Sequence, residues 1–181
     1  MGLDMNLYKK RYVQNWDYMK PKERHEVTVT KGGATVPVKN VAYIVEEVIS
    51  WRKANAIHSW FVNNVQGGVD DCRTAYVSRE NLEELLETTE TVLAASKLVP
   101  GKVSQGQRAN AAGDWEDILE NGTVIADSTI AAELLPTESG FFFGNTHYDE
   151  YYYYDLERTR DALKTALEDE TDNEFEYSSS W

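Results

Sequence analysis

The chain contains a single cysteine, Cys72, so it cannot form an internal disulfide and is expected to work in a reducing compartment. It has no run of the ~18–20 apolar residues that a bilayer-spanning helix needs. The opening residues, 1–4, do not begin a signal peptide. We therefore expect a soluble protein of the cytoplasm, with no attachment to a membrane.

Basic side chains are few. The 181 residues include 18 Lys and Arg against 31 Asp and Glu, a formal net charge of -13. Residues 1–113 carry 15 basic and 13 acidic side chains, whereas residues 114–181 carry 3 and 18. Direct binding of nucleic acid is not expected, because that affinity comes from Lys and Arg displacing counterions. The acidic part is either a solvated helix face with a frayed tail or a surface that docks on a basic partner, such as a nucleic-acid-binding protein.

Patterns of apolar residues predict one α+β domain over residues 1–167. A small antiparallel sheet, built from N-terminal strands and a hairpin around Gly32-Gly33, is expected to be covered by two or three long helices. The Gly-, Ser- and Gln-rich residues 97–113 predict an exposed loop or insertion, with a short helix after it. Residues 168–181 predict an acidic flexible tail. The long helices are expected over roughly 41–65, from Ser78 to about 93, and over 147–167.

The helix expected over 41–65 carries the candidate site. Its apolar stripe presents Asn55 and His58 where valine or leucine would be expected, so it faces either a satisfied polar cluster or a cavity. A guanidinium and an amine beside the stripe suit a phosphate, and two indoles suit a nucleobase. Nearer the C-terminus, the phenylalanines at 141–143 are either core, which is favoured, or a pocket wall, and the tyrosines within 148–154 offer an interaction face. The candidate ligand-binding residues are Trp51, Arg52, Lys53, Asn55, His58, Trp60, Phe142 and Tyr148.

Two alternatives to a binding site stay open. In a small enzyme acting on a nucleotide or a phosphorylated molecule, His58 would be the general acid/base, with Asp70 or Asp71 as an orienting group. In a purely structural role, His58 and Asn55 would only bond to neighbouring strands. No pair of these residues has the spacing of a zinc or calcium site, so no metal is expected, and the sequence does not identify a cofactor.

Several distinctive motifs resemble those of a family of small bacteriophage and prophage proteins. They are MGLDM at 1–5, WRKANAIHSWF at 51–61, DDC at 70–72, LLPT at 134–137 and GFFFG at 140–144. Members of that family are sometimes labelled phosphoglycerate kinase, but that enzyme is a much longer two-domain protein, and this chain has neither GxGxxG nor GxxxxGK[ST]. The resemblance implies an accessory role in a phage, such as countering a host defence or redirecting a host protein. Because no catalytic set is recognisable, we expect the protein to act by binding a host protein or a nucleotide-like small molecule.

Overall fold

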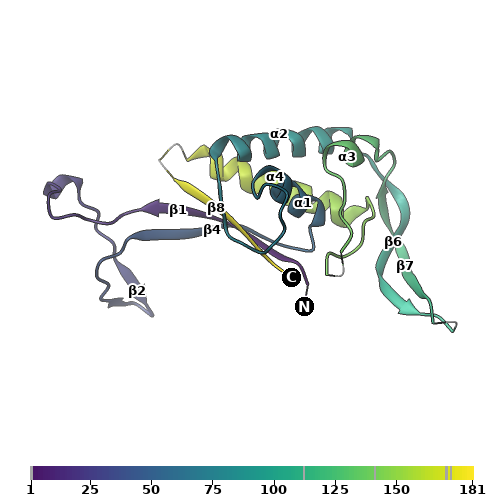
Figure 1. The fold of residues 1–181 in the computed structure, drawn as a ribbon, viewed down its shortest axis with the longest axis horizontal. Coiled ribbons are helices and arrows are strands. Elements are labelled where there is room, and N and C mark those ends of the chain that lie inside the picture. The colour runs from purple at the N-terminus through teal and green to yellow at the C-terminus, as the bar shows by residue number, and fades with distance from the viewer. Residues whose placement is uncertain (1, 112, 141, 170, 172) are drawn as a thin grey trace.

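The computed structural model describes residues 2–111, 113–140, 142–169, 171 and 173–181. At its centre is a four-stranded sheet in which each strand is antiparallel to its neighbours. The long helices pack together above one face of this sheet (Figure 1), so the predicted α+β class is confirmed. In the order in which they pair, the strands are β4 (Tyr43–Arg52), β1 (Asp4–Tyr12), β8 (Glu174–Ser180) and β5 (Ala75–Val77).

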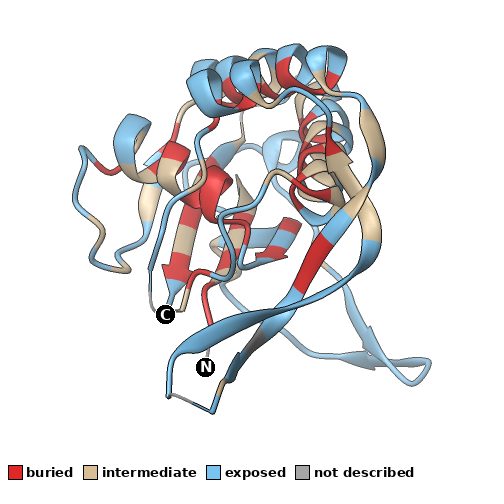
Figure 2. Ribbon diagram, turned by 90° about the vertical axis from the view of Figure 1, so that its right-hand side faces the viewer, coloured by how far each residue is buried: buried red, intermediate tan, exposed pale blue. Residues whose placement is uncertain are grey.

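The core lies between the sheet and the helices. Alternate residues of the two central strands, such as Leu7 on β1 and Tyr177 on β8, are completely buried there (Figure 2). The α2 helix is capped by Ser78 as predicted, because its side chain accepts the N–H of Asn81. The last helix begins at Glu150, later than expected, because Asp149 is its cap. The helices are α1 (Asn55–Asn64), α2 (Arg79–Ala95), α3 (Thr129–Leu134) and α4 (Glu150–Glu168).

The helix expected over 41–65 is wrong for its first half. That half is strand β4, and α1 begins only at Asn55. The segment is rich in Val and Ile, which favour extended backbone, and its buried residues Ile49 and Trp51 alternate as in a strand. The chain then turns at Lys53, whose φ is 61°. The apolar residues along 41–51, which recur at steps of three and four, are therefore compatible with a strand as well as with a helix.

The flexible tail expected over 168–181 is wrong for residues 174–180, which form β8 inside the sheet. Phe175 and Tyr177 point into the core, while Glu176 between them points to the other face. There the Glu176 carboxylate lies 2.6 Å from the amine of Lys10 on β1. Ion pairing with β1 thus lets an acidic segment occupy a central strand.

The loop expected over 97–113 is wrong for residues 98–109, which form a strand. β6 (Leu98–Ala109) pairs with β7 (Trp115–Ile125) in a long hairpin, so the short helix expected around Trp115 is also wrong. Glycine serves close packing in this hairpin. A Cβ at Gly101 would lie 2.6 Å from Cγ2 of Val124, so only glycine fits beside that valine.

Two segments project from opposite ends of the molecule (Figure 1). One is the β6–β7 hairpin. The other, here called the N-terminal arm, is residues 13–42, which connect β1 to β4. It contains a single 3-10 turn, η1 (Pro21–Glu23), and the predicted hairpin of β2 (Val29–Lys31) and β3 (Ala34–Val36). Among the described residues, no helix combines the length and the apolar content that crossing a membrane requires.

Candidate ligand-binding site

The junction between β4 and α1 fixes the positions of the basic side chains. The backbone N–H of Lys53 donates to the carbonyl of Leu3 over 2.7 Å, which ties the turn to the start of β1. Arg52 and Lys53 remain exposed at this turn. The Arg52 guanidinium lies 3.4 Å from a carboxylate oxygen of Asp4, and the two side chains are 65 % and 49 % exposed. Such a solvent-exposed pair is weak, so both cations are available to an anionic group.

The Asn55 side chain organises a neighbouring segment of the chain. Its amide nitrogen donates to the carbonyls of Phe143 (3.0 Å) and Asn145 (2.8 Å), and its oxygen accepts the N–H of Glu138 (3.1 Å). The residue is buried, as predicted, and its polar atoms are bound to main-chain groups. Asn55 therefore shapes the wall of a pocket by holding residues 138–145 in place.

His58 is buried and bonded at both ring nitrogens. Nδ1 lies 2.7 Å from the hydroxyl of Tyr177, and Nε2 lies 3.0 Å from Oδ2 of Asp70. The other Asp70 oxygen accepts the indole N–H of Trp181 at 3.1 Å. This chain of contacts joins α1, the loop after it and the end of β8. Asp71 is not part of it, because its carboxylate accepts the backbone N–H of Arg73 in its own turn.

Three of the predicted aromatic residues are structural. The indole of Trp51 is buried and donates to Thr159 on α4 over 2.8 Å. Trp60 is buried with its ring edge-on to Phe61. Tyr148 accepts the N–H of Thr137 and packs against Tyr152. These side chains support the walls of the site and do not offer free faces for a base.

The larger of two pockets has a volume of about 650 Å³. It lies between the start of α1, the start of α4, the 137–147 segment and the middle of the β6–β7 hairpin. Four predicted site residues line it, namely Arg52, Lys53, Asn55 and Phe142. The structure thus brings both predicted cations to one pocket with a predicted aromatic residue, while Phe141 lies outside the described residues.

Two carboxylates of α4 give this pocket its unusual chemistry. Asp149 is 1 % exposed, and its Oδ1 caps the helix by accepting the N–H groups of Tyr151 and Tyr152. Its Oδ2 is also buried but has no hydrogen-bond partner among the described residues. Burial raises the pKa of Asp155 to about 7. Arg158 opposes this shift and the Asp149 charge adds to it.

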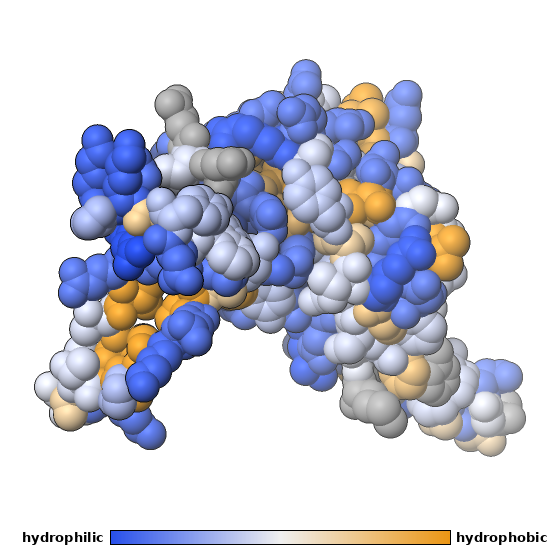
Figure 3. Space-filling model, turned by 60° about the vertical axis from the view of Figure 1, so that its left-hand side comes forward, coloured by the Kyte–Doolittle hydropathy of each residue, from blue (hydrophilic) through white to orange (hydrophobic). Residues whose placement is uncertain are grey.

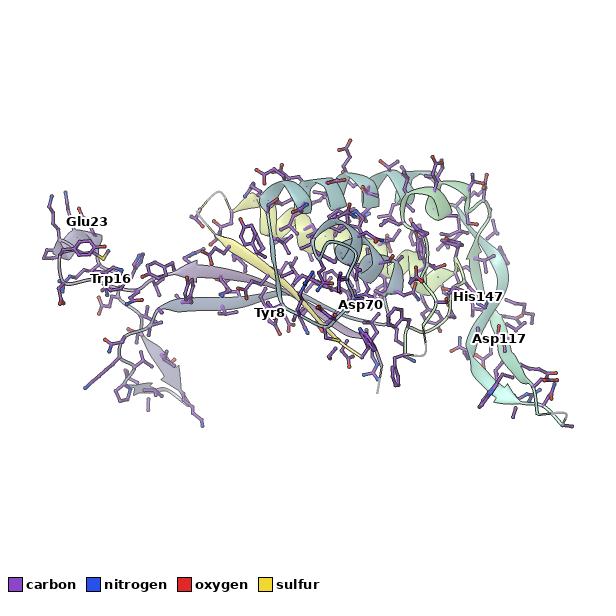
Figure 4. The ribbon with its side chains drawn as sticks, viewed as in Figure 1. Tyr8, Trp16, Glu23, Asp70, Asp117 and His147 are labelled. Carbon is purple, nitrogen blue, oxygen red and sulfur yellow. The ribbon has the colours of Figure 1, made fainter. Side chains whose placement is uncertain are left out.

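The rest of the larger pocket is aromatic and mixed in charge. Tyr151, Tyr152 and Tyr154 line it from α4. Asp117 on β7 and His147 lie next to each other at its edge, 3.8 Å apart at the closest charged atoms (Figure 4). Positive, negative and aromatic groups therefore surround one space of a size that suits a small organic ligand.

A second pocket, of about 460 Å³, lies on the other side of the 138–145 segment. His58, Asp70, Phe142, Phe143 and Trp181 are among the residues that line it. Its polar groups are bonded to one another, as described above, and the Phe143 ring meets Trp181 edge-on. His58 and Arg52 thus face different pockets, whereas the sequence pattern had grouped them in one site.

No group of three or more His, Cys, Asp or Glu side chains in the described part of the chain could hold a metal ion. No model of a protein family, no curated protein and no solved structure matches this chain.

Sequence reasoning missed Asp149 and Asp155 as site residues. Asp149 was expected only in a capping box with Thr146, and Asp155 was not singled out. A signal was present, because the two aspartates bracket a run of four tyrosines in an amphipathic helix. The acid at the helix start and the acid six residues later both line the same pocket.

Proposed function

We propose that the protein acts by binding and that its larger pocket holds a nucleotide-like small molecule. A nucleotide combines a phosphate, which Arg52 and Lys53 suit, with a flat base, which Phe142 and the tyrosines of α4 suit. The base also carries N–H donors, which suit the carboxylates of Asp149 and Asp155. The pocket offers all three kinds of contact.

The observation that carries this proposal is the unpartnered Oδ2 of Asp149. A buried acceptor without a donor is costly, and a ligand N–H that reaches it removes that cost. Oδ1 already accepts two backbone N–H groups, so a base would donate one N–H to Oδ2 and a second to another acceptor of the pocket, such as Asp155. Guanine presents two adjacent N–H donors on its Watson–Crick edge, whereas adenine presents one. We therefore expect guanosine monophosphate to bind more tightly than adenosine monophosphate.

The test is calorimetric titration with guanosine monophosphate, adenosine monophosphate and inorganic phosphate, using the wild type and Asp149→Asn. Asparagine keeps the oxygen that caps α4 and replaces Oδ2 by a donor, so folding is preserved. Loss of the charge-assisted bond should weaken guanosine monophosphate binding by about tenfold to a hundredfold. Asp127→Asn is the matched control, because Asp127 also accepts an N–H in its own turn and lies outside the pocket. Absence of binding by any nucleotide, or equal affinity of Asp149→Asn, would contradict the proposal.

The geometry supports binding better than catalysis by His58. A general acid/base needs a ring nitrogen that reaches the substrate, but both nitrogens of His58 already have partners. Burial also raises the pKa of Tyr177, which keeps its hydroxyl neutral beside the ring. The contacts of His58 favour a role in joining α1 to β8.

The biological setting that we propose is that of a phage accessory protein in the host cytoplasm. The motifs at 51–61 and 134–144 support this by resemblance, and the single cysteine suits a reducing compartment. The net charge of -13 favours a host protein with a basic surface as the macromolecular partner.

A further inference from the structure

The N-terminal arm, residues 13–42, is folded but has no core of its own. Every residue from 14 to 42 is described, and none of them is buried. Paired hydrogen bonds of 2.8 Å between Asn15 and His25, and the short β2–β3 ladder, hold its shape. Ordering so much backbone costs free energy that burial normally offsets. The arm therefore has the properties of a segment whose side chains become buried against another surface.

Apolar side chains on the arm stay in solvent. Tyr18 is 83 % exposed and Trp16 45 %, and three valines of the β2–β3 region are also exposed. Figure 3 shows apolar side chains gathered beside hydrophilic ones on the projecting N-terminal arm, which comes forward in this view. Patches of this kind commonly mark protein interaction sites.

The arm has the opposite charge to the rest of the protein. It carries five basic and three acidic side chains, a net charge of +2, so the remaining residues carry -15. None of the five basic side chains forms an ion pair with any described residue. The arm therefore suits an acidic surface outside its own chain.

The far end of the same molecule presents such a surface. The hairpin tip, residues 105–121, carries one basic and four acidic side chains, a net charge of -3. Trp115 is 70 % exposed on it and Leu119 is 53 % exposed. The hairpin is a sheet of only two strands, so its outer edges are open to pairing.

We propose that the N-terminal arm of one copy docks on the hairpin tip of a second copy. The two surfaces have opposite charges, both expose aromatic side chains, and they lie at opposite ends of the molecule (Figure 1). Contact between two different surfaces is head-to-tail, so it builds a ring where the rotation closes and a filament where it does not. The docking does not require a ligand, although Gln105, Gly106 and Asp117 of the tip also line the larger pocket.

A charge swap measured by sedimentation velocity tests the docking. Variant one carries Lys22→Glu and Lys31→Glu in the arm, and variant two carries Glu116→Lys and Glu120→Lys in the hairpin tip. The wild type should exceed the monomer mass at tens of micromolar in low salt and return to monomer in high salt. Each variant alone should be monomeric, and the chain with all four changes should associate again. All four side chains are exposed, and circular dichroism verifies that each variant is folded.

A wild type that stays monomeric at every concentration and salt would overturn the proposal. So would association of either variant to the same extent as the wild type. A short oligonucleotide added to the same samples tests whether the arm binds an external polyanion instead of a second copy. Its binding to a monomeric wild type, lost in variant one, would show that the arm serves an external polyanion and would also overturn the proposal.

Discussion

Replacing Asp155 by asparagine should stabilise the protein progressively as the pH rises. Asp155 lies on α4 and lines the larger pocket. Burial of its carboxyl group is the largest cause of a pKa of about 7 in the folded protein, against 3.8 for an ordinary aspartate, and Arg158 offsets only part of this. Asparagine has the same shape and no charge to desolvate.

The direction in which wild-type stability changes with pH follows from proton binding. Between pH 4 and pH 7 the folded protein holds a proton on Asp155 that the unfolded chain has released, so wild-type stability falls as the pH rises through this window. Above pH 7 the effect is complete and constant. At about 1.4 kcal/mol per pKa unit the ceiling is about 4 kcal/mol, and solvent in the pocket should reduce it to roughly 2 kcal/mol.

Urea unfolding of wild type and Asp155→Asn at several pH values from 4.5 to 8.5 measures the effect. The difference in unfolding free energy should grow up to pH 7 and then level off. Asp161→Asn is the control on the same helix, because Asp161 is exposed and a hydrogen bond from Arg160 lowers its pKa. The control difference should not change between pH 4.5 and 8.5. A pH-independent difference for Asp155→Asn would refute the argument that its carboxyl is desolvated.

Two further predictions concern the fold. Removing residues 174–181 should abolish cooperative thermal unfolding, because it takes away a central strand. Loss of the buried side chains of Phe175 and Tyr177 lowers the unfolding free energy by about 3–5 kcal/mol each. A truncated chain that melts like the wild type would show that β8 is dispensable. Gly140→Ala should lower the unfolding free energy by about 1–3 kcal/mol, because a Cβ there would lie 2.7 Å from the ring of Phe143. Ser139→Ala at the neighbouring exposed position should have little effect, and equal melting temperatures for the two variants would contradict the packing argument.

Local signals in the sequence were sufficient for the elements that depend on neighbours in the chain. Ser78 caps α2, and the Gly32-Gly33 turn joins β2 to β3, as the residue types there predict. The burial of Asn55 and His58 was also predictable from their place in an apolar pattern. These inferences needed only the period of a helix or the chemistry of a turn.

The elements that were missed depend on partners distant in sequence. Residues 174–180 are a strand only because β1 and β5 lie on either side, and Lys10 on β1 pairs with Glu176. β6 is a strand because β7 pairs with it along its length. Acidic or glycine-rich composition describes a segment by itself, so it cannot reveal a strand that is stabilised by pairing elsewhere.

The same reasoning explains the errors in the site. The sequence grouped Trp51, Arg52 and His58 as neighbours on one helix, but Trp51 and Arg52 belong to a strand. Successive strand residues point to opposite faces, so Trp51 is in the core and Arg52 is in solvent. Asp149 and Asp155 flank a run of tyrosines, but no pattern in the sequence shows that α4 starts beside the turn after β4, so these aspartates were not assigned to the site.

The β6–β7 hairpin connects the two proposals physically. Residues 104–106 and Asp117, in the middle of the hairpin, line the larger pocket, and residues 105–121 carry the acidic surface on which a second copy is proposed to dock. A hairpin that leans toward or away from α4 changes the pocket and moves the tip at the same time. If a ligand favours one of these positions, it changes the affinity of the tip for the arm, and by thermodynamic linkage docking changes ligand affinity by the same factor. The ligand and the second copy would then be coupled through one two-stranded ribbon, which has few buried residues to resist bending.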